Sequence, residues 1–305
     1  MRFRLVCTSL AFWLLLSLCA ANSSTTALSI YRHDGSIDIE IVRNSRTINR
    51  QLLAKWVQDS ADAVADYYGS IPIRHIVVRV TPVAGSGVGF STATEEDGKG
   101  IIEVPVGVDT TSGELRHDWT LTHEMLHLGF PLMDDRHRWL AEGIATYAEP
   151  IARLRNGSVT VDEVWGDLVN NLPKGLRACK VGLRNARSID GVYWGGALYC
   201  LLADIKIREK THGRKGLKEA LRAILRDGGD ISSDWEFEDA IADGDKAIGA
   251  PVLRNLYDQM ADRPPAIDLD NLWSSLGVGK RDGHIVFDDS APLAWVRKEI
   301  APAKQ

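Results

Sequence analysis

Two neighbouring segments of the sequence carry a complete set of metal-binding side chains, and they constrain the fold more than any other feature. The first reads His-Glu-Met-Leu-His at 123–127, and the second reads Trp-Leu-Ala-Glu-Gly at 139–143. Residues four apart lie on one face of a helix, so His123 and His127 can present both imidazoles to one ion. Glu142 supplies a third ligand. Both segments are therefore expected to be helices whose ligand-bearing faces meet.

The ligand types indicate one catalytic Zn²⁺ ion. Two neutral histidines and a carboxylate leave the ion an open fourth position, which distinguishes a catalytic zinc site from a structural one. Glu124 is turned about a quarter-circle round the helix, where its carboxylate can act as the general base on the attacking water. The alternative is a chance match on an amphipathic helix. A chance match does not explain why Glu142 lies among apolar residues such as Trp139 and Ile144. Burial of an unpaired charge costs several kcal/mol, so a carboxylate at this position needs a partner.

The N-terminal residues predict export. Arg2 and Arg4 precede an apolar run from Leu5 to Leu18, and small residues follow. This is the pattern of a signal peptide over residues 1–21, so we expect the protein to be periplasmic or secreted. Contact with a membrane is expected only through an uncleaved signal or through a lipid anchor, for which residues 16–19 give a faint signal.

Composition restricts the partners. Removal of residues 1–21 takes away two arginines and no acids, which moves the net charge from −5 to −7. The sequence has no basic stripe with interleaved aromatic residues, so nucleic acid is not an expected partner. Outside the signal segment the cysteines are Cys179 and Cys200. They form either a disulfide or two separate buried thiols, and the sequence leaves both alternatives open.

The pattern of apolar residues predicts an α+β fold with a small mixed sheet. We expect a sheet-bearing lobe at 22–112 and a mainly helical lobe at 113–305, which together form a single catalytic domain. The expected elements are a hairpin at 28–43, a helix at 47–68, strands at 71–83 and 88–106 that glycines at 85, 87, 98 and 100 break, a zinc-binding helix from an N-cap at Asp118 to Gly129, helices at 138–154, 161–169, 193–210, 214–226, 250–260 and 268–276, and a last strand at 284–287. Ser233 and Glu236 predict a capping box for one more helix.

These segments resemble the gluzincin zinc peptidases, in particular a compact peptidase-MA-like branch related to the aminopeptidase N and glycyl aminopeptidase families. Residues 139–149 follow that family's Trp-Leu-x-Glu-Gly-x-Ala-x-Tyr-x-Glu pattern. Tyr-Trp-Gly-Gly at 193–196 is similar to its Tyr-x-Lys-Gly segment. The resemblance implies a thermolysin-like core, a peptide or protein substrate, and a role for Tyr193 in stabilising the oxyanion. The alternative for Tyr193 is an aromatic residue packed in the core.

The sequence also departs from the family. Its segment Gly-x-Met-Glu-Asn, which binds the free amine of the substrate, is missing. The only segment with a weak similarity to it is Gly-Ile-Ile-Glu-Val at 100–104. Glu103 is therefore either an amine-binding residue on a strand beside the cleft or a solvated strand carboxylate. Because of this departure, the choice between exopeptidase and endopeptidase action stays open.

Other polar residues near the motifs have weaker assignments. Thr146 and Glu149 follow Glu142 at helical spacing, which favours a hydrogen bond to the outer nitrogen of a ligating histidine. The alternative is a solvated Glu149 near the end of its helix. His117, His137, Asp134 and Asp135 are expected to be surface or loop-capping residues. The sequence thus predicts a zinc-dependent metallopeptidase, and the competing class is a metal-binding or scaffold protein that has kept the fold without catalysis.

Overall fold

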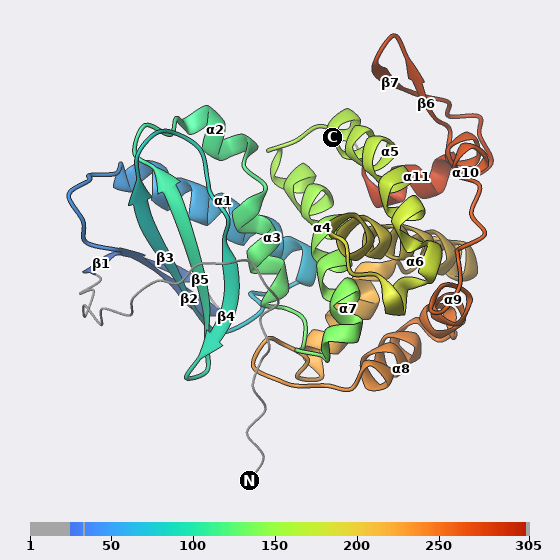
Figure 1. The fold of residues 1–305 in the computed structure, drawn as a ribbon, viewed down its shortest axis with the longest axis horizontal. Coiled ribbons are helices and arrows are strands. Elements are labelled where there is room, and N and C mark those ends of the chain that lie inside the picture. The colour runs from blue at the N-terminus through green and yellow to red at the C-terminus, as the bar shows by residue number, and fades with distance from the viewer. Residues whose placement is uncertain (1–24, 33, 303–305) are drawn as a thin grey trace.

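The structure is a computed structural model that describes residues 25–32 and 34–302 (Figure 1). The predicted signal segment at 1–21, with Cys7 and Cys19, lies outside the described residues. Within the described residues, no helix combines the length and the hydropathy that crossing a membrane requires.

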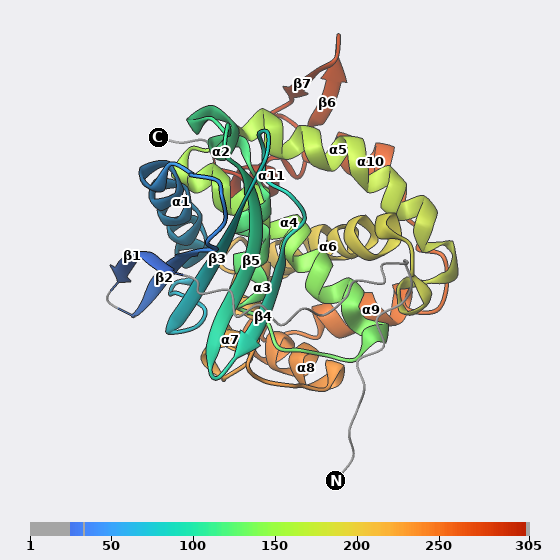
Figure 2. The same ribbon diagram turned by 60° about the vertical axis from the view of Figure 1, so that its left-hand side comes forward.

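Five strands form one mixed sheet. They are β1 (Thr25–Arg32), β2 (Gly35–Ile41), β3 (His75–Val83), β4 (Thr92–Glu96) and β5 (Lys99–Gly107), in the spatial order β1-β2-β3-β5-β4. The pairs β2–β3 and β3–β5 are parallel, whereas β1–β2 and β4–β5 are antiparallel. The strand β4 is therefore an edge strand, and Figure 2 shows it beside the helical part of the molecule.

The helix α1 (Arg50–Tyr68) covers one face of this sheet (Figure 1). Its N-cap Asn49 accepts hydrogen bonds from two backbone N–H groups of the first turn, and it ends at Gly69, which has a φ of 89°. A left-handed residue at this position favours glycine. Alternate residues of β3 and β5 pack with the buried face of α1 in one hydrophobic core, including Ile76, Val78 and Val104. Strand alternation places the intervening side chains on the opposite face of the sheet.

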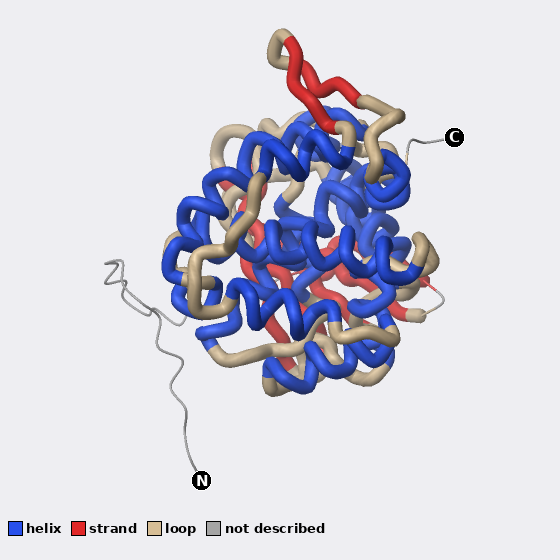
Figure 3. The backbone as a smooth tube through the Cα atoms, turned by 90° about the vertical axis from the view of Figure 1, so that its right-hand side faces the viewer, coloured by secondary structure: helices blue, strands red, loops and turns tan. Residues whose placement is uncertain are grey.

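The rest of the chain is mainly helical. The helices are α2 (Ser112–His117), α3 (Thr120–His127), α4 (Arg138–Asn156), α5 (Val161–Ala178), α6 (Gly196–Thr211), α7 (Leu217–Arg226), α8 (Phe237–Ile248), α9 (Val252–Met260), α10 (Leu269–Leu276) and α11 (Ala294–Ile300). Short 3-10 turns lie at Asp135–His137, Cys179–Val181 and Leu183–Asn185, and a π-helical turn, η4 (Asp190–Gly195), leads into α6. A small hairpin joins β6 (Val278–Arg281) to β7 (His284–Phe287). Figure 3 shows the helices gathered in front of the sheet.

Helix α4 lies at the centre and contacts α1, α3, α5, α6 and η4. Its crossing with α6 depends on two glycines. A Cβ atom added to Gly143 would overlap the backbone of Gly196, and a Cβ atom added to Gly196 would overlap the carbonyl group of Trp139. Only glycine allows two helix backbones to approach so closely. This contact fixes α4 against the chain segment that begins at η4.

The mixed α+β class and most of the expected helices are confirmed, and the strand region predicted at 88–106 divides into two strands near the expected glycine break. The structure has two antiparallel strands there, β4 and β5, joined at Asp97 and Gly98. Both residues have positive φ, 52° and 78°. An Asp-Gly pair in this conformation forms a tight hairpin turn whose twist matches that of the flanking strands.

Several predicted element ends are wrong. The helix predicted at 161–169 continues to Ala178 as α5, because its buried face continues through Leu168 and Leu172. The first residue of α3 is Thr120 rather than the residue after Asp118, although Asp118 still accepts the N–H of Leu121 at 3.3 Å. The helix ends at His127 rather than at Gly129. The β7 strand is not the last element, because α11 follows it.

The predicted capping box of α8 is absent. The hydroxyl of Ser233 donates to the carbonyl of Asp230, and α8 begins only after Glu236, whose side chain makes no capping hydrogen bond. Cys179 and Cys200 are free and fully buried, so the structure contains two separate thiols rather than a disulfide. The Cys179 thiol donates weakly to the carbonyl of Gly191 at 3.7 Å. The lobe boundary near residue 112 stays a prediction.

Candidate metal centre

Helix α3 carries the first metal-binding segment. It has eight residues, a length that is only marginally stable in isolation, so packing must hold it in place. Leu121, Met125 and Leu126 are buried in the core that α3 shares with α1 and α4. The hydroxyl of Tyr68 at the end of α1 donates to the carbonyl of Leu126 at 3.1 Å. With this face buried, the other side of α3 presents both histidines to α4.

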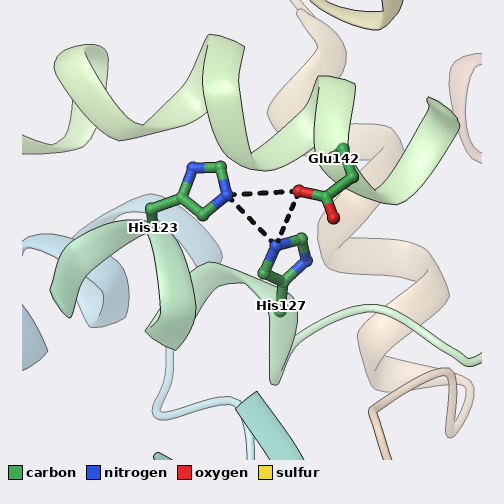
Figure 4. Close-up of side chains that lie close together, drawn as sticks. All are labelled: His123, His127 and Glu142. Atoms are coloured by element: carbon green, nitrogen blue, oxygen red, sulfur yellow. Dashed lines mark hydrogen bonds and ion pairs between the residues drawn. The ribbon is translucent and has the colours of Figure 1, made fainter. Parts of the chain in front are cut away.

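The three predicted ligands meet between α3 and α4 (Figure 4). The Nε2 atoms of His123 and His127 lie 3.2 Å apart, and the Oε2 atom of Glu142 lies 3.4 Å from each of them. The three ligand atoms thus form a nearly equilateral triangle. His123 and Glu142 are buried, and His127 is partly buried.

This triangle fits zinc. In a tetrahedral site with bonds of about 2.0–2.1 Å to nitrogen or oxygen, neighbouring ligand atoms lie roughly 3.3–3.4 Å apart. The donor set also fits, since two imidazoles and one carboxylate are common ligands of this ion. In this arrangement two imidazole nitrogens face each other, and a carboxylate oxygen lies at hydrogen-bond distance from both. A cation placed between these three atoms would stabilise the arrangement. The residues present can therefore hold one metal ion.

The electrostatics of these residues favour the forms that bind metal. Burial lowers the pKa of His123 below its ordinary value, despite the nearby Glu142 carboxylate, so this imidazole is neutral at pH 7. Burial acts to raise the pKa of Glu142, but hydrogen bonds with His123 and His127 outweigh it and hold this pKa far below its usual range. A neutral imidazole and an ionised carboxylate are the states in which these side chains coordinate a cation.

Arg138 is a site residue that the sequence reasoning missed. Its Nε and Nη2 atoms donate to Oε1 of Glu142 at 3.2 and 3.1 Å, whereas Oε2 of the same carboxylate faces the histidines. Arg138 precedes Glu142 by four residues on α4, and this spacing indicates a side-chain pair on one face of a helix. The two carboxylate oxygens thus have different partners, and Arg138 fixes which of them faces the histidines.

We expect Arg138→Ala to weaken zinc binding by about 10- to 100-fold, the effect typical of losing a group that orients a ligand. The fold should be unaffected, because the Arg138 side chain is 63% exposed. Competition with a chromophoric chelator measures the zinc dissociation constant. Arg136→Ala is the matched control, since Arg136 pairs only with Asp134 in the described structure. Equal zinc affinities in the two variants would contradict the role of Arg138.

Glu124 lies between α3 and the sheet edge. Its carboxylate accepts a hydrogen bond from the backbone N–H of Ala93 on β4. Burial raises the pKa of Glu124, and the Glu142 charge acts in the same direction, while His127 and Ala93 oppose them. A carboxylate with a raised pKa is a better proton acceptor, as a general base requires. The strand that borders the site is therefore β4, and not the strand of Glu103 as the sequence reasoning expected.

Tyr193 lies in the π-helical turn η4 and stacks on His123. The two ring centroids are 5.8 Å apart and the ring planes differ by 7°. Its hydroxyl interacts with the Glu142 carboxylate and with Arg138. Burial, followed by the charge of Glu142, raises the pKa of Tyr193 to about 12, so the hydroxyl remains a hydrogen-bond donor at neutral pH. The structure thus brings Tyr193 to the three ligands from about fifty residues further along the chain.

Thr146 and Glu149 do not make the predicted hydrogen bonds to a ligand histidine. Among the described residues, the buried Oγ1 atom of Thr146 has no hydrogen-bond partner. Glu149 accepts from Nη1 of Arg153 at 2.7 Å, and both side chains are less than 10% exposed. Burial raises the pKa of Glu149 to about 7; the charge of Arg153 opposes this shift, and Asp167 and Asp118 add to it. Glu149 is therefore neither solvated nor bonded to a ligand.

The raised pKa of Glu149 predicts a pH-dependent stability. Between pH 4.5 and 7 the folded chain binds a proton that the unfolded chain has released, so this group's contribution to the free energy of unfolding falls as pH rises through that window. We expect wild type, relative to Glu149→Gln, to lose on the order of 1 to 3 kcal/mol between pH 4.5 and 8. Urea unfolding of both proteins at several pH values measures the difference. Parallel pH profiles would contradict the prediction.

Glu103 lies away from the ligands. It is 59% exposed on β5, on the face of the sheet opposite α1, and it accepts a hydrogen bond from Nη1 of Arg79 at 2.9 Å. Arg79 also pairs with Glu40 on β2. Glu103 is thus an exposed strand carboxylate in an ion-pair ladder, which favours the second of the two interpretations given for it.

The four polar residues near the motifs stay outside the ligand set. Asp134 caps the turn before α4 by accepting the N–H of Arg136, as expected. His137 is buried rather than at the surface, because its ring stacks on Phe237 and its Nε2 atom lies 3.2 Å from the hydroxyl of Tyr257. His117 and Asp135 are exposed, as expected.

Neither a protein-family model nor a curated protein matches this sequence. Solved structures do match the fold. An aminopeptidase N family protein from Idiomarina loihiensis has a TM-score of 0.62 and 14% identity, over 84% of this chain and 49% of that one. A two-domain M1 zinc metallopeptidase bound to L-arginine has a TM-score of 0.52 and 16% identity, over 80% of this chain and 52% of that one.

A second structure of a two-domain M1 zinc metallopeptidase, bound to L-tryptophan, has a TM-score of 0.51 and 17% identity, over 80% of this chain and 54% of that one. The chain thus spans about half the length of the structures it matches. These similarities confirm the expected relationship in fold to aminopeptidase N and to the M1 zinc metallopeptidases.

Proposed function

We propose that this protein is a zinc-dependent metallopeptidase. The observation that carries the proposal is the triangle formed by His123, His127 and Glu142, whose sides of 3.2 to 3.4 Å fit a tetrahedral zinc ion. The fold shared with M1 zinc metallopeptidases supports a peptidase, and two of those structures are named as bound to amino acids. We therefore propose a peptide or protein as the substrate.

The residues of the chain have separate roles in this proposal. A zinc ion held by His123, His127 and Glu142 would act as a Lewis acid and would lower the pKa of the attacking water. Glu124 accepts a proton from that water and passes it to the leaving amine. The Tyr193 hydroxyl, which stays protonated because of its raised pKa, donates a hydrogen bond to the oxyanion of the tetrahedral intermediate. Arg138 holds the Glu142 carboxylate in the orientation described above.

Elemental analysis followed by digestion of a peptide library tests the proposed function. We expect about one zinc ion per chain and cleavage of library peptides that stops on addition of a chelator and resumes with added zinc. Metal without cleavage of any peptide would instead favour the scaffold protein considered from the sequence. Libraries with free and with acetylated N-termini are compared in parallel, because loss of cleavage on acetylation identifies an aminopeptidase.

We also propose that the protein acts outside the cytoplasm, in the periplasm or as a secreted enzyme. The support for this is the charged and apolar pattern of residues 1–21. Fractionation of cells that express the full chain tests it, with N-terminal sequencing of the product. Retention in the cytoplasm with an intact N-terminus would contradict export.

A further inference from the structure

A cavity of about 820 Å³ opens beside the metal centre, and the proposed mechanism does not use it. His123 and Tyr193 belong to its lining, so the cavity begins at the metal-ligand group. Its other walls come from the segment before α3, from α4 beyond Thr146, from α5 and from η4. A substrate bond held at the metal would therefore have one neighbouring side chain next to this opening.

Part of the wall is aromatic or aliphatic and open to solvent. Trp119 is 51% exposed, and its ring meets the ring of His123 edge-on with centroids 5.4 Å apart. Ile189 is 76% exposed, and Trp194 is partly buried on η4. Large apolar side chains that stay exposed beside a catalytic group mark a surface that a ligand covers. This part of the wall fits the methylene stem of a long side chain.

The remaining wall is acidic. Three acidic residues, Glu149, Glu163 and Asp167, line the cavity together with Arg153 and His117. The formal charge of the three acids and the arginine is −2, and it is still −1 with Glu149 protonated. Arg153 is already engaged, because it donates to Glu149 and to the carbonyl of Arg116.

Asp167 is the acidic residue of this wall that makes neither a close ion pair nor a helix cap. It accepts a hydrogen bond from Asn171 at 2.7 Å, and Lys174 and Arg153 act on its charge from beyond ion-pair distance. Glu163 caps α5 through the N–H and hydroxyl groups of Thr160, and it still contributes its charge to the cavity. The buried Thr146 Oγ1 belongs to the same lining, and it has no hydrogen-bond partner among the described residues. A half-buried carboxylate that makes no close ion pair, beside a catalytic site, favours a cationic ligand.

We propose that this cavity is a specificity pocket that takes the lysine or arginine side chain of the substrate residue next to the cleaved bond. The inference rests on the proposed peptidase function and adds its substrate class. The methylene stem lies against Trp119 and Trp194, and the cationic group reaches Asp167 and Glu163, a pairing that amphipathic basic side chains favour. An acidic side chain is rejected by the like charge.

Binding to the zinc-loaded Glu124→Gln protein tests the pocket without requiring cleavage. The probes are alanine pentapeptides with free ends, in which one arginine occupies each position in turn, and matched peptides with citrulline, which keeps the shape without the charge. Calorimetry is expected to show at least 10-fold tighter binding of arginine than of citrulline at one position. In the Glu124→Gln background, a second substitution Asp167→Asn should bring the ratio of arginine to citrulline affinities close to one. Glu163→Gln in the same background should lower this ratio.

Asp162→Asn is the matched control, because Asp162 lies five residues before Asp167 on α5, is exposed and does not line the cavity. It removes the same charge and should leave the ratio unchanged. Equal binding of arginine and citrulline peptides at every position would overturn the inference, whether or not the wild-type enzyme cleaves peptides. An equal fall of the ratio in Asp162→Asn and Asp167→Asn would also overturn it. Failure of the peptidase proposal is read separately, from the library digest of the wild-type protein.

Discussion

Glu124→Gln is expected to retain its zinc ion and to lose peptidase activity by on the order of 10³-fold, the range that positioned acid–base groups contribute. Glutamine has the shape of glutamate and can still accept the hydrogen bond from the N–H of Ala93. It cannot accept a proton from water. The measurement combines zinc content with kcat/KM on a peptide that wild type cleaves.

Glu96→Gln provides the control for this substitution. Glu96 lies at the end of β4, is exposed and pairs with Arg79 at 3.7 Å, so the same change there should leave kcat/KM unaltered. If the Glu124→Gln protein remained fully active with zinc bound, the general-base assignment would be wrong. Loss of zinc along with activity would instead assign Glu124 to the metal-ligand set.

Gly143→Ala is expected to lower the free energy of unfolding by about 3 kcal/mol or more and to reduce zinc binding. The new methyl group would overlap the backbone of Gly196 on α6. Overpacking of side chains commonly costs about 1 to 3 kcal/mol, and backbone atoms have less freedom to move away. Because Gly143 follows Glu142 directly, separation of α4 from α6 also displaces a ligand. Urea unfolding and zinc titration measure both effects.

The matched control is Gly113→Ala in α2. A Cβ atom there would meet only the Thr111 hydroxyl at 3.8 Å. We expect this protein to be as stable as wild type or slightly more stable, since alanine has the higher helix propensity. Equal stability of the two alanine variants would show that the contact between α4 and α6 adapts to a methyl group.

The ligand set could be predicted from the sequence because its information is local. His123 and His127 are related by one helical turn, and Glu142 is marked by its apolar surroundings. The same spacing rule would have found Arg138, one turn before Glu142, and Arg153, one turn after Glu149. The salt bridge to Arg153 explains why Glu149 does not serve a ligand histidine.

The sheet edge beside the site could not be predicted in the same way. Ala93 contributes a backbone N–H, and no side-chain pattern identifies a main-chain donor. The Asp97-Gly98 pair did signal a hairpin, and with it an edge strand in front of β5. The interpretation of Glu103 followed from the match of residues 100–104 to the family's amine-binding segment, and not from the arrangement of the strands. Tertiary packing, and not local propensity, decides which strand supplies the main-chain donor to Glu124.

The wide turn η4 has a consequence for how Tyr193 reaches His123. A π-helical turn holds more residues than an α-helical one, and each residue of an α-helix advances the chain by about 100°. Deletion of a residue from Asp190–Gly195 would allow α6 to continue backward as an ordinary helix. Tyr193 would then rotate by roughly that angle relative to α6 and leave the ring of His123. The extra residue of this turn thus sets the direction in which the Tyr193 ring faces relative to α6.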